Sequence, residues 1–204
     1  MALRAVPDER AVFLNVPFDR GYEPLFIALI ASLVAIGRIP RTVLEISDRG
    51  QGRLRRIVEQ MQTCRVSLHD LSRVGNPSRF NMPFELGIAY ALRRFRGRSQ
   101  PYLIVLLESK AHRLSRTLSD MAGYDPVIHQ GKPWGAITAV LDSMGADTGD
   151  PDPQDVYRMW RRLMKVARVF KQQQHRNSIY SRTMFRLLVA AAAELAIDAG
   201  LIVR

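Results

Sequence analysis

The sequence predicts an α/β fold, with a doubly wound parallel sheet of about five strands and helices on both faces. Three observations support this prediction. Short apolar runs of strand length alternate with longer apolar or amphipathic segments, which is the pattern of βα units. The run at 102–107 is apolar throughout, as expected of a parallel strand covered on both faces. Clusters of Gly, Pro and Asp separate the runs.

Taken in order, the runs define each element. The expected strands are 11–16, 40–46, 66–68, 102–107 and a short edge strand at 126–128. The expected helices are 22–36, 54–61, a helix starting near Asn81, 113–121, 134–144, 156–171 and 181–199. Helix 22–36 is apolar on nearly every side, so we expect it to be largely buried.

The helix near Asn81 begins in the stretch RFNMPFELGIAYA at 79–91. Asn81 is a good N-cap and Pro83 suits the first helical turn, which places Glu85 at the start of the helix. The face expected to pack on the sheet carries Phe84, Ile88 and Ala91. A carboxylate at this position has two interpretations, a functional group or a simple complement to the helix dipole.

Asp70 follows the third strand, in a segment at 64–73 that ends on polar residues. Ligands of open parallel sheets bind beyond the carboxyl ends of the strands. We therefore expect Asp70 and Glu85 to face one crevice, although an Asp after a strand is also a common turn former.

A stretch rich in Gly, Asp and Pro at 145–153 marks a boundary, which divides the chain into an α/β domain at 1–146 and a helical hairpin at 151–204. The first hairpin helix is amphipathic and basic. The second is nearly uncharged through 187–193 and needs cover, from the first helix or from a partner chain. We expect a homo-oligomer that forms through these helices.

Composition and charge limit the partners, the compartment and the cofactors that the chain is expected to have. The 204 residues carry a formal charge of +11, which favours anionic partners. A single cysteine, Cys64, excludes an internal disulfide, and the apolar stretch at 25–36 is too short to span a bilayer. We expect a cytoplasmic protein with no membrane partner. The four histidines lack metal-ligand spacing, and no GxGxxG or GxxxxGK[ST] motif occurs, so neither metal nor cofactor is predicted.

Three motifs together resemble a known superfamily, the nucleoside 2-deoxyribosyltransferase-like group and its TIR-like relatives. They are VFLNVPFD at 12–19, HDLSR at 69–73 and the stretch at 79–91, and the resemblance spans about residues 11–145. It implies a flavodoxin-like sheet with a pocket for a nucleoside or nucleotide. By this resemblance Glu85 matches the glutamate that attacks or stabilises the anomeric carbon, and Asp70 matches an aspartate that contacts the base or sugar.

The same resemblance predicts pocket-lining residues at Asn15, Pro17, Phe18, Asp19 and Asn81. The chain departs from the group in its basic charge, its added C-terminal helices and its cluster of Arg41, Glu45 and Asp48. Further candidates follow from chemistry. His69 could assist the leaving base as a general acid. A phosphate could be held by Arg41, Arg73 and Arg79, unless each of these is solvated or paired with Glu45 or Asp48.

The leading hypothesis is an enzyme that cleaves or transfers the N-glycosidic bond of a nucleoside or nucleotide, with NAD among the candidates. Cleavage builds positive charge on the sugar, which a carboxylate such as Glu85 can stabilise or trap covalently. The alternative is a TIR-like module that senses a nucleotide and acts by self-association, without turnover. A nucleic-acid contact through the basic helix ranks last, because few aromatic residues interleave its charges.

Overall fold

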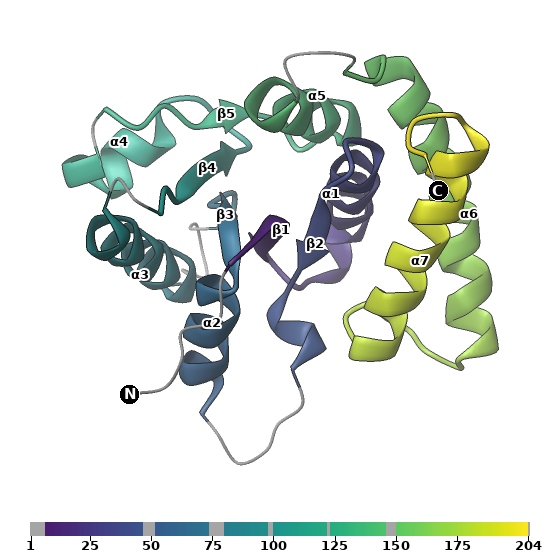
Figure 1. Ribbon diagram of the computed structural model, residues 1–204, viewed down its shortest axis with the longest axis horizontal. Helices are drawn as coiled ribbons and strands as arrows, with labels where there is room; N and C mark the ends of the chain where they lie inside the picture. The colour runs from purple at the N-terminus through teal and green to yellow at the C-terminus, as the bar shows by residue number, and fades with distance from the viewer. Residues whose placement is uncertain are drawn as a thin grey trace.

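A computed structural model describes residues 7–46, 52–73, 80–97, 100–121, 123–145 and 150–203. It confirms the predicted fold class, because five parallel strands form one sheet in the order β2-β1-β3-β4-β5 (Figure 1). The strands are β1 (Asp8–Asn15), β2 (Ile39–Arg41), β3 (Cys64–Asp70), β4 (Leu103–Glu108) and β5 (Val127–Ile128). The helices are α1 (Glu23–Ala35), α2 (Arg53–Gln62), α3 (Asn81–Arg96), α4 (Arg113–Thr117), α5 (Pro133–Met144), α6 (Pro153–Gln173) and α7 (Arg182–Asp198).

The strand order reverses at β1, which has β2 on one side and β3 on the other. This is the flavodoxin-like order, and its switch point lies between β1 and β3. The register pairs Asn15 with His69 and Asp70 with Leu107, so the carboxyl ends of β1, β3 and β4 meet at one edge of the sheet. That edge is where the loops and helix starts converge.

Alternating side chains of the strands feed two separate cores. On one face Val12 and Leu14 pack with α1 and α5, and on the other Ala11 and Phe13 pack with α2 and α3 (Figure 1). Residues Leu25 to Ala35 of α1 are all buried, as the sequence predicted. They can be, because α6 and α7 cover the side of α1 that faces away from the sheet.

The second strand is shorter than predicted. It ends at Arg41 rather than 46, and a 3-10 turn spans Val43–Glu45. The Thr42 hydroxyl accepts a hydrogen bond from the N–H of Leu44, while the carboxylate of Glu45 accepts one from the N–H of Thr42, at 3.1 Å each. This capping box satisfies the backbone locally and ends the strand. The predicted helix at 113–121 is likewise divided, into α4 and a 3-10 turn at Ser119–Met121.

Helix α3 starts where predicted, but its buried face was predicted wrongly. Phe80, not Asn81, holds the N-cap position, and no side chain caps the helix. Phe84 is 58% exposed, whereas Glu85 is buried. The buried face of α3 comprises Met82, Glu85, Leu86 and Ala89. Both stripes fit a helical period, and packing selects the one that turns the carboxylate of Glu85 inward.

Helices α6 and α7 form a C-terminal hairpin that shares a hydrophobic core with α1, so the division into two domains stays a prediction. Three polar contacts fix the hairpin there. Lys171 Nζ lies 2.7 Å from Glu23 Oε2, the N–H of Ile179 donates to Glu23 Oε1, and Trp160 Nε1 donates to the carbonyl of Pro24. The apolar side of α7 is thus covered by α6 and α1 of the same chain, so oligomerisation stays a prediction. Within the described residues, no helix has the length and apolar character to cross a membrane.

We predict that Glu23→Ala lowers the free energy of unfolding by about 2 kcal/mol, because it leaves the buried N–H of Ile179 unpaired and Lys171 without its carboxylate. Urea unfolding measures the loss. Glu9→Ala removes an exposed carboxylate that is paired with Arg65 and should change stability by less than about 0.5 kcal/mol. Equal stability of the two variants would contradict this role of Glu23.

Candidate active site

A cavity of about 540 Å³ opens at the carboxyl end of β1, beside the switch point of the sheet. The fold class binds its ligands at this position. The walls come from β1 and the loop after it, the turn at Val43, α2, and the start of α3. The described lining residues are Phe13, Leu14, Asn15, Val16, Pro17, Phe18, Val43, Arg53, Ile57, Phe80, Asn81, Met82 and Glu85.

Glu85 is the carboxylate of this cavity. It is 5% exposed, and it makes no hydrogen bond or ion pair with any residue that the structure describes. Burial raises the pKa of Glu85, and the positive charge of Arg53 opposes that rise. A carboxylate that is largely buried and has no hydrogen-bonding partner is costly for stability, and such groups concentrate at functional sites.

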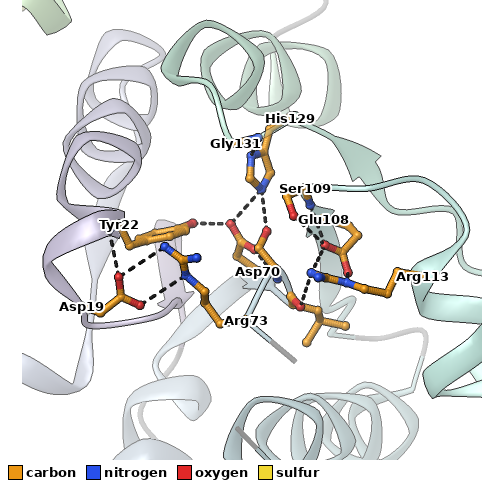
Figure 2. A network of polar contacts seen from close by, with 11 residues as sticks. Asp19, Tyr22, Asp70, Arg73, Glu108, Ser109, Arg113, His129 and Gly131 are labelled. Carbon is orange, nitrogen blue, oxygen red and sulfur yellow. Dashed lines mark hydrogen bonds and ion pairs between the residues drawn. The ribbon is translucent and has the colours of Figure 1, made fainter. Parts of the chain in front are cut away.

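Asp70 has the opposite environment, because three hydrogen-bond donors surround its carboxylate (Figure 2). It is fully buried, its Oδ1 accepts from the N–H of Ser72 at 2.8 Å, and its Oδ2 accepts from the hydroxyl of Tyr22 and from His129 Nε2. Burial alone would raise the pKa of Asp70, but the hydrogen bonds from His129, Ser72 and Tyr22 bring it below its usual value. Asp70 is held as a buried anion.

The geometry of His129 shows how that anion is held. The N–H of Gly131 donates to His129 Nδ1 at 3.0 Å, so this nitrogen carries no proton and the other one does. His129 Nε2 therefore carries the proton, and it lies between two acceptors, Ser72 Oγ at 2.8 Å and Asp70 Oδ2 at 3.1 Å. Tyr22 comes from the turn before α1 and His129 from the residue after β5, so the Asp70 carboxylate joins three elements (Figure 2).

Asp70 and Glu85 do not face one crevice, and that expectation is corrected. Successive residues of a strand point to opposite faces of a sheet. Asp70 lies on the α1 face with Tyr22, and the cavity and Glu85 lie on the α2 and α3 face. His69 is on the cavity side, but it is fully buried and not part of the described lining.

The structure brings some predicted residues together and separates others. Around the cavity lie Asn15, Pro17, Phe18, Asn81 and Glu85. Away from its lining lie Asp19, Arg41, Glu45, His69, Asp70 and Arg73. Arg41 pairs with Glu45 at 3.1 Å, which is one of the alternatives stated above. Arg73 pairs with Asp19 at 3.4 Å, a partner that the sequence did not suggest. Asp48 and Arg79 fall outside the described residues.

Sequence reasoning missed three residues. Arg53 lines the cavity but stands in a run of arginines with nothing to distinguish it. No motif or spacing in the sequence distinguishes Tyr22 from other tyrosines. His129 directly follows the short strand β5, the same position relative to its strand that made Asp70 a candidate, so the same rule could have found it. Among the described residues, no three His, Cys, Asp or Glu side chains gather as a metal site would require.

The C-terminal hairpin supports one wall of the cavity. The ring of Phe18 lies 6.0 Å from that of Phe26, edge to face, and 5.2 Å from that of Tyr180. The hydroxyl of Tyr180 donates to the carbonyl of Asp19 at 2.8 Å. The loop after β1 is therefore held from outside the α/β domain, by a residue that precedes α7.

We predict that Glu85→Gln stabilises the protein at pH 7, by on the order of 1 kcal/mol. The raised pKa means that the folded state binds the proton of Glu85 more tightly than the unfolded state does. Stability is therefore lost as pH rises from the ordinary pKa of a glutamate to the raised pKa of Glu85 in the folded state, and the advantage of the variant should vanish below about pH 4. Thermal melts from pH 3.5 to 8 measure this; a variant less stable than wild type at pH 7 would refute it.

For Asp70 the sign is reversed. Its lowered pKa means that its contribution to stability is present above about pH 4 and is lost as pH falls further. In Asp70→Asn an amide N–H₂ replaces one carboxylate oxygen and faces hydrogen-bond donors that need an acceptor. The substitution should lower the free energy of unfolding by about 3 kcal/mol at pH 7. The stability of the variant should also depend less on pH in the acid range. Urea unfolding between pH 3 and 7 tests both points, and a cost independent of pH would exclude an anionic Asp70.

Comparison of the chain with protein-family models, with curated proteins and with solved structures gave no match. The resemblance to nucleoside 2-deoxyribosyltransferase-like and TIR-like proteins therefore stays a prediction from the three motifs. The fold class and the position of the cavity are findings of the structure itself.

Proposed function

We propose that this chain is an enzyme that cleaves or transfers the N-glycosidic bond of a nucleoside or nucleotide, with Glu85 as its catalytic carboxylate. One observation carries the proposal. Glu85 is buried and has no partner among the described residues, and it lines a ligand-sized cavity at the switch point of a parallel sheet. The motif resemblance adds the substrate class.

The environment of Glu85 suits this chemistry. Loss of the base leaves positive charge on the sugar, and a buried carboxylate such as Glu85 attracts that charge more strongly than one in bulk solvent. The same carboxylate can attack the anomeric carbon and form a glycosyl-enzyme intermediate. Since no described hydrogen bond or ion pair occupies Glu85, its oxygens are available to the sugar.

The other polar groups of the cavity favour a phosphorylated substrate. Arg53 is the cation among the described lining residues, and a guanidinium can bind a phosphate through two hydrogen bonds. Asn15 and Asn81 can contact a base or a sugar, and Phe18 and Phe80 offer flat apolar surfaces to a base. Because Asp70 lies outside the cavity, we assign it no step in the reaction.

We predict that wild-type protein releases free base from at least one member of a panel of nucleosides, nucleoside monophosphates and NAD, and that Glu85→Gln lowers the rate at least about 100-fold. Liquid chromatography measures the released base. Glu59→Gln makes the same change at an exposed position on α2 and should keep the wild-type rate. Base release by Glu85→Gln at the wild-type rate would remove Glu85 from the mechanism.

A sensing module that self-associates is the second candidate. It is favoured by exposed aromatic side chains on α3, with Phe84 58% and Phe95 85% exposed. Such a module would bind a nucleotide without releasing base. If the panel binds but is not turned over, and ligand increases the molar mass in light scattering, this second function replaces the first.

A further inference from the structure

Next to Glu85, on the same face of the sheet, three polar side chains form a chain that ends at the cavity. Asn15 and His69 are paired in the register of β1 and β3, so their side chains lie side by side. Asn15 Nδ2 lies 2.9 Å from His69 Nδ1, and His69 Nε2 lies 2.9 Å from Ser67 Oγ. Ser67 and His69 are fully buried, whereas Asn15 lines the cavity.

The His69 ring has a fixed charge state. Burial lowers the pKa of His69 to about 3, so the ring is neutral at any pH near neutrality and has one N–H and one lone pair. With the Asn15 nitrogen facing Nδ1, that lone pair accepts from Asn15, and the N–H at Nε2 donates to Ser67. Both ring nitrogens are thereby engaged, which fixes the ring and the tautomer.

This arrangement determines what Asn15 offers to a ligand. Its amide nitrogen is engaged by His69, and its Oδ1 makes no hydrogen bond with any residue that the structure describes. The carbonyl of Asn15 and the carboxylate of Glu85 are both acceptors, and both belong to the cavity lining. A ligand that satisfies them has to supply hydrogen-bond donors.

We propose that His69 is a positioning residue, held by Ser67, that orients the Asn15 amide so that its Oδ1 accepts a hydrogen bond from a hydroxyl of the substrate sugar. This inference rests on the proposed function, because a sugar at Glu85 brings its hydroxyls to the neighbouring acceptor. It replaces the role of general acid that the sequence suggested for His69. A ring buried in this way does not reach the ligand, and a neutral imidazole lacks the extra proton that a general acid gives up.

The test measures binding rather than turnover. Glu85→Gln protein is titrated calorimetrically with the nucleoside 5′-monophosphates and with analogues that lack the 2′- or the 3′-hydroxyl. One missing hydroxyl should weaken binding roughly threefold to tenfold, the value of one neutral hydrogen bond. His69→Leu, added to Glu85→Gln, should weaken binding of the parent ligand by the same factor and abolish the difference between parent and analogue. This non-additivity is the signature of one shared contact.

Control variants separate positioning from folding. His69→Asn keeps an acceptor near the position of Nδ1 and should restore much of the discrimination. Asn15→Ala removes the acceptor at the cavity wall and should act like His69→Leu even if the latter folds poorly. Ser32→Ala removes a buried hydroxyl of α1 that bonds the carbonyl of Ala28, and it should leave binding unchanged.

The outcomes are distinct. If ligands bind but His69→Leu or Asn15→Ala weakens parent and analogue equally, the positioning role is wrong while the proposed function stands. If no ligand of the panel binds Glu85→Gln and wild type releases no base, the proposed function fails and this inference fails with it.

Discussion

A fully buried carboxylate anion is stable only when hydrogen bonds replace the water that it has lost. At Asp70 this requirement determines how the elements at the sheet edge are placed around the carboxylate. Its partners come from the turn before α1, from the end of β3 and from the residue after β5. The start of α5 has to fit the same arrangement. A Cβ at Gly135 would clash with the backbone carbonyl of His129, so a residue without a side chain brings α5 against the network.

The two buried carboxylates near this edge, Asp70 and Glu85, have opposite environments. Asp70 accepts three hydrogen bonds, which lower its pKa despite burial, and its side chain is fully buried and lies outside the described cavity lining. Glu85, on the other face, is buried without such bonds, so its pKa is raised. The folded state therefore stabilises the anion of Asp70 and destabilises the anion of Glu85. Under the proposed function, Glu85 is the carboxylate that gains from a cationic transition state.

The sequence predicted the fold class because its signals are local: apolar strands, glycine and proline breaks, and alternation with helices. What it missed depends on distant residues. The Asp70 network joins Tyr22, 48 residues earlier, and no periodicity reports such a partner. The α3 sequence carries two apolar stripes, and only packing against β3 and β4 decides between them. Strand alternation was available, however, and it already implies that His69 and Asp70 cannot face the same crevice.

The C-terminal hairpin links the stability of the core to the shape of the cavity. Helix α1 is apolar on all sides, so the sheet can cover only part of it, and α6 and α7 cover the rest. The same hairpin contacts both loops beside the cavity: Tyr180 packs on Phe18, and α7 packs on the turn that contains Val43. A shift of α7 would therefore move two cavity walls and leave the strands, with Asn15 and its partner His69, in register. The hairpin supports loops at the cavity wall, whereas β1 and α3 hold Asn15 and Glu85, the two groups that we propose contact the ligand.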